Sequence, residues 1–113
     1  MPLRRRWIAK VTHYDGHRFA SRAEAKRYWE LKQMQKMGKI EGLLVHPPIP
    51  IKVPNPAGEL VEVCKYIGDF AYASGAEWVI EDVKSPMSRT PVYRLKKKLV
   101  EIVTGMKITE INS

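Results

Sequence analysis

Two segments in the middle of the chain, residues 60–72 and 77–84, are rich in β-branched and aromatic residues. Such segments favour strands, and turn-forming small residues separate the two, Ala73-Ser74-Gly75-Ala76. A connection this short predicts a hairpin with antiparallel strands. We therefore expect the chain to fold around a β-hairpin.

A helix is predicted before this hairpin, at residues 21–37. Ser21 stands three residues before Glu24, which is the spacing of a capping box, and Gly38 closes the segment. One face of this helix combines a carboxylate with apolar, aromatic and amide side chains: Glu24, Tyr28, Leu31 and Gln35. Because these residues recur at helical spacing, we expect Glu24 to face inward.

The segment between helix and hairpin is interrupted by prolines. Pro47, Pro48 and Pro50 within residues 40–53 suit a loop or an edge strand but not a central strand. Residues 55–58, Asn-Pro-Ala-Gly, are typical of a turn before the first hairpin strand.

A second helix is predicted from Pro91 to about Thr104, with Thr90 as its cap. Gly105 ends it, and residues 106–111 form a last strand. Its apolar stripe is expected to face the core: Val92, Leu95, Leu99, Ile102 and Val103. The predicted order is helix, three strands, helix, strand, in an α/β (α+β) fold.

The length of 113 residues fits one domain with a hydrophobic core. We expect a basic arm and a short extended segment over residues 1–19, and a single domain over residues 20–113. No apolar run reaches the roughly 18 residues that a membrane span needs. The single cysteine, Cys64, excludes an intrachain disulfide and fits a reducing compartment. A cytoplasmic protein without membrane spans is expected.

The strongest compositional clue to function is charge. A formal net charge of +8 and a pI near 9.7 favour polyanionic partners, nucleic acid first. A basic protein can also carry such charge for solubility alone, so the functional class depends on the chemistry of particular residues.

The candidate chemistry lies on the two hairpin strands. Side chains alternate along a strand, so Asp82 and Lys84 point to one side while Glu81 and Val83 point to the other. Asp69, on the preceding strand, comes within cross-strand range of Asp82 if the register is right. A register slip would put Glu81 in place of Asp82, but Lys84 would then lie on the opposite face.

Two carboxylates and an amine in one cleft suit phosphodiester hydrolysis. Carboxylate oxygens are ligands for Mg²⁺ or Mn²⁺, which takes its remaining contacts from water and phosphate. We expect Asp69 and Asp82 to hold the metal and Lys84 to orient or help deprotonate the attacking water and stabilise the transition state. Glu24 could complete the carboxylate set, although a capping-box glutamate that reaches back to Ser21 explains it without catalysis.

These residues resemble the PD-(D/E)XK nuclease superfamily: Asp69, then Asp82-Val83-Lys84 after a hairpin, with an N-terminal helix glutamate. The resemblance runs from about Tyr14 to Ile111 and is strongest to small phage-type endonucleases, including Holliday junction resolvases. It implies a restriction-endonuclease-like αβββαβ core, with a central mixed sheet flanked by helices, in which Glu24, Asp69, Asp82 and Lys84 match the catalytic positions. The sequence departs from the pattern at Gly68, where the superfamily name has proline.

The resemblance also implies a homodimer that binds branched DNA and cuts two strands symmetrically. Apolar candidates for the dimer contact lie near the proline-rich segment: Ile40, Leu43, Leu44 and Val45.

Candidate DNA contacts lie in three places. The arm carries Arg4, Arg5 and Arg6, which can follow phosphates or only aid solubility. In the loop after the hairpin, Ser85 and Arg89 are well placed to reach a phosphate. On the second helix, Lys96, Lys97 and Lys98 can contact DNA or form a solvated face. Stacking on bases is an alternative to core or interface packing for Trp29 and Trp78.

The three histidines, His13, His17 and His46, have no ligand spacing and are expected to be solvated or locally hydrogen-bonded.

The resulting hypothesis is a metal-dependent DNA endonuclease, specifically a Holliday junction resolvase of a bacterial or phage-infected cell. A nuclease with another DNA preference is one alternative. A non-catalytic nucleic-acid-binding protein, with the acidic residues in structural ion pairs, is the other.

Overall fold

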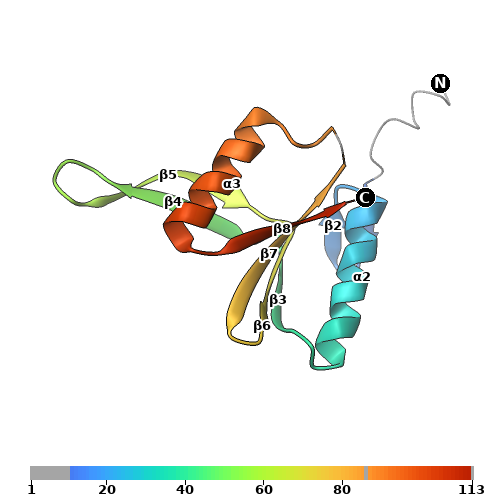
Figure 1. Cartoon of the computed structure of the whole chain (residues 1–113). Helices are drawn as coiled ribbons and strands as arrows, with labels where there is room; N and C mark the ends of the chain where they lie inside the picture. The colour runs from blue at the N-terminus through green and yellow to red at the C-terminus, as the bar shows by residue number, and fades with distance from the viewer. Residues whose placement is uncertain (1–10, 86, 113) are drawn as a thin grey trace, which may run out of the picture.

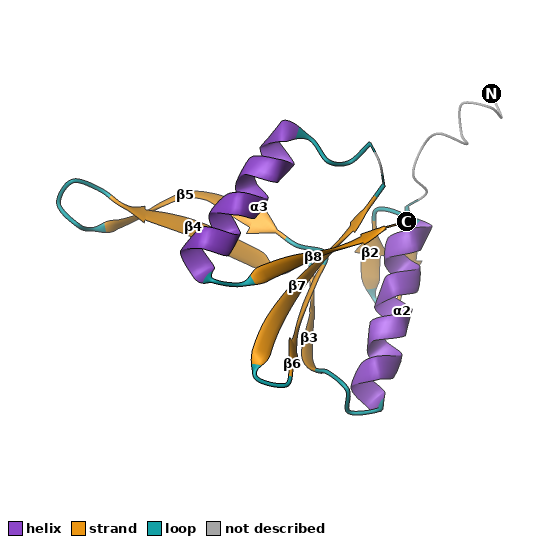
Figure 2. Ribbon diagram, viewed as in Figure 1, coloured by secondary structure: helices purple, strands orange, loops and turns teal. Residues whose placement is uncertain are grey.

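The structure is a computed structural model that describes residues 11–85 and 87–112, so the arm residues Arg4, Arg5 and Arg6 lie outside the described part. Figures 1 and 2 show the arrangement of its helices and strands. In chain order these are β1 (Thr12–Tyr14), β2 (His17–Phe19), α2 (Arg22–Lys36), β3 (Glu41–Val45), β4 (Pro48–Pro54), β5 (Leu60–Ile67), β6 (Phe70–Ser74), β7 (Glu77–Lys84), α3 (Pro91–Thr104) and β8 (Lys107–Asn112).

A four-stranded sheet in the order β3-β6-β7-β8 forms the centre of the fold. Neighbouring strands are antiparallel except β7 and β8, which are parallel because α3 connects them. Side chains alternate between the two faces of the sheet and so belong to two separate apolar clusters. Phe70 and Tyr72 pack with α2, while Ala71 and Ile80 pack with Val100 of α3. The expected α+β fold with a mixed sheet flanked by helices is confirmed.

Both predicted helices form with the predicted N-caps, and α2 ends at the C-cap Met37, one residue before the predicted Gly38. Ser21 Oγ accepts a hydrogen bond from the Glu24 amide at 3.2 Å, and Thr90 Oγ1 accepts one from the Tyr93 amide at 3.1 Å. Gly105 closes α3 with φ of 74°, a conformation that glycine adopts without strain. Local capping chemistry therefore sets the bounds of both helices.

The predicted strand over residues 60–72 is wrong as a single element. It divides at Gly68-Asp69 into β5, which pairs with β4, and β6, which pairs with β3 and β7. At this break the Gly68 amide donates to Pro47 O at 3.2 Å, and the Asp69 amide donates to Glu81 O at 3.0 Å. The hydrogen bonds thus pass from one sheet to another within two residues. The β4–β5 hairpin extends away from the central sheet (Figure 1).

Residues 12–19, predicted as an extended segment before the domain, form a hairpin that contributes to the core. Its turn is Asp15-Gly16, with φ of 54° and 79°. Phe19 is fully buried and its ring lies 5.2 Å from that of Tyr28, centroid to centroid. The predicted boundary at residue 20 therefore separates a hairpin from the core to which it belongs.

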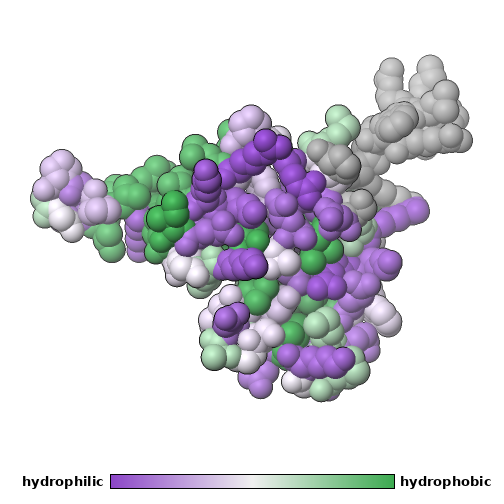
Figure 3. All heavy atoms as spheres, in the orientation of Figure 1, coloured by the Kyte–Doolittle hydropathy of each residue, from purple (hydrophilic) through white to green (hydrophobic). Residues whose placement is uncertain are grey.

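The predicted core stripe of α3 is also wrong. Within α3 the fully buried residue is Val100, and Leu99 is partly buried in the same cluster. The rest of the stripe is exposed: Val92, Leu95, Ile102 and Val103. Figure 3 shows hydrophobic surface where α3 and the β4–β5 hairpin lie. The helix is amphipathic as predicted, but most of its apolar stripe faces away from the protein's own core.

The apolar residues predicted for a dimer contact lie mostly in the protein's own core, and the two tryptophans predicted to pack do not. Ile40 is buried, Leu43 and Val45 pack partly buried against the core, and Leu44 is half exposed, so this group is mostly core. Trp29 and Trp78 are about half exposed rather than packed in the core. Among residues 11–85 and 87–112, no helix is long and apolar enough to cross a membrane.

Candidate metal centre and catalytic site

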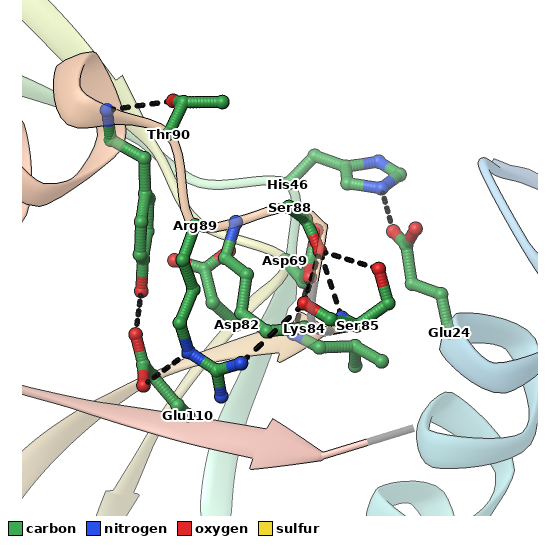
Figure 4. A network of polar contacts seen from close by, with 12 residues as sticks. Glu24, His46, Asp69, Asp82, Lys84, Ser85, Ser88, Arg89, Thr90 and Glu110 are labelled. Atoms are coloured by element: carbon green, nitrogen blue, oxygen red, sulfur yellow. Dashed lines mark hydrogen bonds and ion pairs between the residues drawn. The ribbon is translucent and has the colours of Figure 1, made fainter.

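Asp69 and Asp82 lie side by side because of the β6–β7 register. Phe70 is paired with Glu81, so Asp69, one residue before Phe70, falls next to Asp82. Asp69 Oδ2 also accepts a hydrogen bond from the Val83 amide at 2.7 Å, which ties its carboxylate to β7. Figure 4 shows Asp69 and Asp82 near each other. The register that the sequence reasoning required is present.

Asp82 is buried, and one of its carboxylate oxygens lacks a hydrogen bond. The residue is 3% exposed, and its Oδ2 has no hydrogen-bond partner within the described residues. Burial raises the pKa of its carboxyl to about 6, and the nearby Lys84 ammonium opposes this rise. A buried carboxylate oxygen without a donor is unfavourable in the apoprotein, and a bound cation would satisfy it.

Lys84 points to the same side of β7 as Asp82, as strand alternation predicts. Its Nζ lies 4.0 Å from Asp82 Oδ1 and 3.8 Å from the centre of the Tyr93 ring. The side chain is 15% exposed. The aromatic ring and the carboxylate together hold the ammonium group at the edge of the acidic site.

Glu81 lies on the opposite face, as strand alternation requires. Its two carboxylate oxygens accept hydrogen bonds from Arg27 Nε and Nη2, each at 2.7 Å, and Oε2 also accepts one from the Tyr72 hydroxyl. This fully paired carboxylate connects β7 to α2. The geometry therefore places Asp82, not Glu81, in the candidate site.

Glu24 makes the contacts of a capping box and also contacts His46 at the candidate site. Its amide donates a hydrogen bond to Ser21 Oγ, and its Oε2 accepts one from the Ala20 amide, each at 3.2 Å, as in a capping box. Its Oε1, in contrast, lies 2.6 Å from His46 Nε2. The side chain is 5% exposed and extends from α2 toward His46 (Figure 4).

His46 is the residue that sequence reasoning missed. It lies between β3 and β4 in the left-handed conformation, with φ of 51°, and its amide donates to Asp69 O at 2.9 Å. Its sequence neighbours include no other ligand type, so spacing could not identify it. The backbone bond to Asp69 brings it to the site through tertiary structure.

Glu24, His46 and Asp69 form a cluster that can hold a metal ion, with one ligand atom from each lying within 4.8 Å of the others. Two opposite ligands at about 2.1 Å from a small divalent ion lie about 4.2 Å apart, so small side-chain rotations suffice. Asp82 is outside this set, although the charge of Glu24 acts on its pKa. Burial likewise raises the pKa of Asp69 to about 6, and the Val83 amide opposes the rise. The donor set and the unsatisfied Asp82 oxygen fit a divalent cation.

Gly68 has a local reason to differ from the proline of the superfamily pattern. A Cβ at this position would lie 2.8 Å from Ile80 Cγ2, which is closer than real contacts allow. Proline would add that carbon and remove the amide that donates to Pro47 O. The close packing beneath Asp69 therefore requires glycine here.

The predicted DNA contacts in the loop and on α3 are partly engaged within the protein. Ser85 and Ser88 hydroxyls bond each other, and Arg89 bonds Glu110 Oε1 at 3.1 Å and Asn112 Oδ1 at 2.7 Å. Lys96 Nζ donates to Lys65 O at 3.3 Å. These residues hold the loop and α3 in place, whatever else they contact.

A basic cleft of about 630 Å³ lies between α3 and β8. Its basic lining residues are Arg89, Arg94, Lys97 and Lys98. Glu110, also in the lining, is paired with Asp82 in the β7–β8 register, so the cleft adjoins the strand that carries the site. A polyanion bound there would lie near the carboxylates.

The chain matches the family described as "Protein of unknown function (DUF1064)" over residues 4–111. No curated protein and no solved structure matches it.

Proposed function

Because the chain belongs to the DUF1064 family, whose function is unknown, we propose a function from the site itself: a divalent-metal-dependent DNA endonuclease. The observation that carries this proposal is the pairing of Asp69, immediately before β6, with Asp82 on β7, where Lys84 lies next to Asp82 on the same face. A structural ion pair would satisfy both carboxylates, whereas Asp82 Oδ2 is buried without a partner among the described residues.

The residues divide the work of phosphodiester hydrolysis. Asp69, Asp82 and Glu24 would hold Mg²⁺ or Mn²⁺, which when bound supplies phosphate charge neutralisation and water activation. Lys84, held by Asp82 and the Tyr93 ring, is close enough to orient the attacking water and to stabilise negative charge that develops on the phosphate. The basic cleft beside β8 supports a polyanionic substrate.

The finer proposal is a Holliday junction resolvase that acts as a homodimer in the cytoplasm of a bacterial or phage-infected cell. The exposed apolar stripe of α3 supports dimerisation, because an amphipathic helix that leaves this face uncovered can bury it against a second copy. Two active sites related by a two-fold axis suit symmetric cutting of a four-way junction.

The test is cleavage of a labelled four-way junction and of a linear duplex with the same arm sequences, each with Mg²⁺, Mn²⁺ or EDTA. We expect metal-dependent cleavage of the junction and weaker cleavage of the duplex. Equal cleavage of both would exclude the resolvase but not the nuclease. Binding of both without metal-dependent cleavage would favour the non-catalytic nucleic-acid-binding alternative.

Asp82→Asn separates catalysis from binding, because it removes a metal ligand and leaves the basic surface intact. We expect loss of cleavage with junction binding retained. Glu62→Gln, on the exposed face of β5, is the matched control and should cleave as the wild type does.

A further inference from the structure

His46 is in contact with the acidic site but has no place in the proposed nuclease chemistry. Its Nε2 faces Glu24 Oε1 at 2.6 Å, and the two belong with Asp69 to one cluster of possible ligands. Both carboxylates of the cluster would serve Mg²⁺ equally well without an imidazole. The presence of a nitrogen donor therefore bears on which metal the site takes.

We propose that His46 is a metal ligand through Nε2 and makes this a mixed nitrogen and oxygen site that binds Mn²⁺ in preference to Mg²⁺. This inference rests on the proposed function for its biological meaning, but metal binding can be measured without any nucleic acid.

The chemistry of the ligands supports selectivity. Mg²⁺ is a hard ion that is bound in proteins by oxygen ligands and keeps several waters. Imidazole suits transition metals such as Zn²⁺ and Fe²⁺, whereas carboxylate oxygens suit Mg²⁺ and Mn²⁺ alike. Of the latter two ions only Mn²⁺ belongs to the first-row transition series, so an added nitrogen ligand favours it over Mg²⁺. A site with two carboxylates and an imidazole, beside the unsatisfied Asp82 oxygen, matches Mn²⁺ better than Mg²⁺.

The backbone supports the placement of the imidazole. His46 has a positive φ, a conformation that costs energy for a residue other than glycine, and its amide bond to Asp69 O keeps it there. The Phe19 ring, 5.8 Å from the imidazole between centroids, packs on the same side chain. The ring is therefore held at the site from two directions.

The test compares metal binding by the wild type with that by His46→Asn. Asparagine tolerates positive φ, so the backbone is kept, but its shorter side chain cannot replace the imidazole. The probe is Mn²⁺ alone, titrated by electron paramagnetic resonance, with Mg²⁺ affinity taken from competition. His13→Asn, at an exposed position on β1, is the matched control.

We expect the wild type to bind Mn²⁺ at least about tenfold more tightly than Mg²⁺, and His46→Asn to lose about tenfold in Mn²⁺ affinity with less than about threefold loss for Mg²⁺. The echo modulation of bound Mn²⁺ should contain a directly coordinated nitrogen that His46→Asn removes and His13→Asn keeps.

Equal losses for both metals, or no nitrogen coupling in the wild type, would overturn the inference and leave His46 as a residue that positions Glu24. The two proposals fail separately. Nitrogen coupling in a protein that cleaves no DNA would refute only the nuclease, and cleavage at a site without nitrogen coupling would refute only the ligand role. If His46→Asn does not fold, His46→Gln gives the same comparison, and absence of nitrogen coupling in the wild type overturns the inference without any variant.

Discussion

Asp69 Oδ2 accepts a hydrogen bond at 2.7 Å from the amide of Val83, the residue between Asp82 and Lys84. The bond fixes the carboxylate of one strand against the backbone of the next and occupies one of its two oxygens. The second oxygen can then serve a cation without loss of this bond. Main-chain geometry thus positions Asp69 beside β7. The chemistry of the site then depends on the two side chains that β7 presents there, Asp82 and Lys84.

Lys84→Ala should strongly reduce the cleavage rate while leaving the metal bound. Lys84 Nζ is next to Asp82 Oδ1 but is itself a cation, so its loss removes charge stabilisation and no ligand. We expect a decrease of roughly 10²- to 10⁴-fold in the cleavage rate, typical of a lost general acid–base or electrostatic group. Mn²⁺ affinity, measured by paramagnetic resonance, should change little.

Lys107→Ala, an exposed lysine at the start of β8, removes the same charge away from the acidic pair and should cleave normally. Near wild-type cleavage by Lys84→Ala would place the active site elsewhere.

The stability of the metal-free protein should fall as pH rises from about 4 to about 7. Burial raises the pKa values of Asp69 and Asp82 to about 6, above the ordinary aspartate value of 3.8. The folded state then binds more protons than the unfolded state in this range, so stability is present at low pH and is lost as pH rises through 6. The rise from 3.8 to about 6 corresponds to at most about 3 kcal/mol for each group, at about 1.36 kcal/mol per pKa unit.

Thermal unfolding in EDTA at a series of pH values measures this loss, and Mn²⁺ at pH 7 should reverse it. Asp82→Asn should flatten the pH dependence. Below about pH 4 the opposite trend takes over, because the pKa of Glu110 is lowered, first by the Tyr93 hydroxyl. A metal-free protein that becomes more stable between pH 5 and pH 7 would contradict the effect of burial on the pKa values of these two carboxyls.

Arg27→Ala should destabilise the fold without affecting metal binding. The substitution leaves Glu81, 1% exposed, without its bidentate partner, and a buried carboxylate left unpaired costs roughly 3–5 kcal/mol. Urea unfolding measures the change, with Arg22→Ala, on an exposed position of the same helix, as control. Lost Mn²⁺ affinity at unchanged stability would instead mean that Glu81 belongs to the metal site.

The candidate site was largely predictable from the sequence because it depends on local rules. Alternation along a strand places Asp82 and Lys84 on one face and Glu81 on the other, and the short turn at Gly75 sets the register to Asp69. Residue spacing on a helix likewise predicted that Glu24 faces inward, and Glu24 is buried on α2. Each of these relationships spans few residues or one tight turn, so periodicity and turn length suffice.

The rest depended on contacts between distant segments. The sequence around Gly68-Asp69 is typical of one continuous strand, so it does not predict the break there. Hydrogen bonds to Pro47 and Glu81 fix the position of the break. His46 reaches the site through its bond to Asp69 and its contact with Glu24. Residue patterns reveal which side chains are apolar or polar, but not which distant segment they meet.

Gly68→Ala should destabilise the protein by roughly 1–3 kcal/mol, the usual cost of overpacking. Gly68 does not need a positive φ, so the cost comes from the 2.8 Å approach of the added Cβ to Ile80 Cγ2. A double-mutant cycle with Ile80→Ala isolates this contact, because alanine removes the clashing carbon. In urea unfolding the double variant should be more stable than the sum of the two single changes predicts. Strict additivity would mean that the clash is not the reason for glycine.

The apolar stripe of α3 leads to the last prediction, since it separates residues that support the fold from residues that need a partner. Val100 is fully buried, so Val100→Ala should lower the free energy of unfolding of the monomer by roughly 1–3 kcal/mol. Leu95, 60% exposed on the other face, should tolerate Leu95→Glu within about 0.5 kcal/mol in the monomer.

In a dimer built on this face, Leu95→Glu places a charge on each side of a two-fold contact, where like charges repel. Sedimentation should therefore show a dimer for the wild type and a monomer for Leu95→Glu. Lys52→Glu, which changes an exposed residue of β4 outside the α3 stripe, should leave the dimer intact. A wild type that sediments as a monomer at all concentrations would remove the support that α3 gives to paired cutting of a junction, and the metal site of the single chain would stand without it.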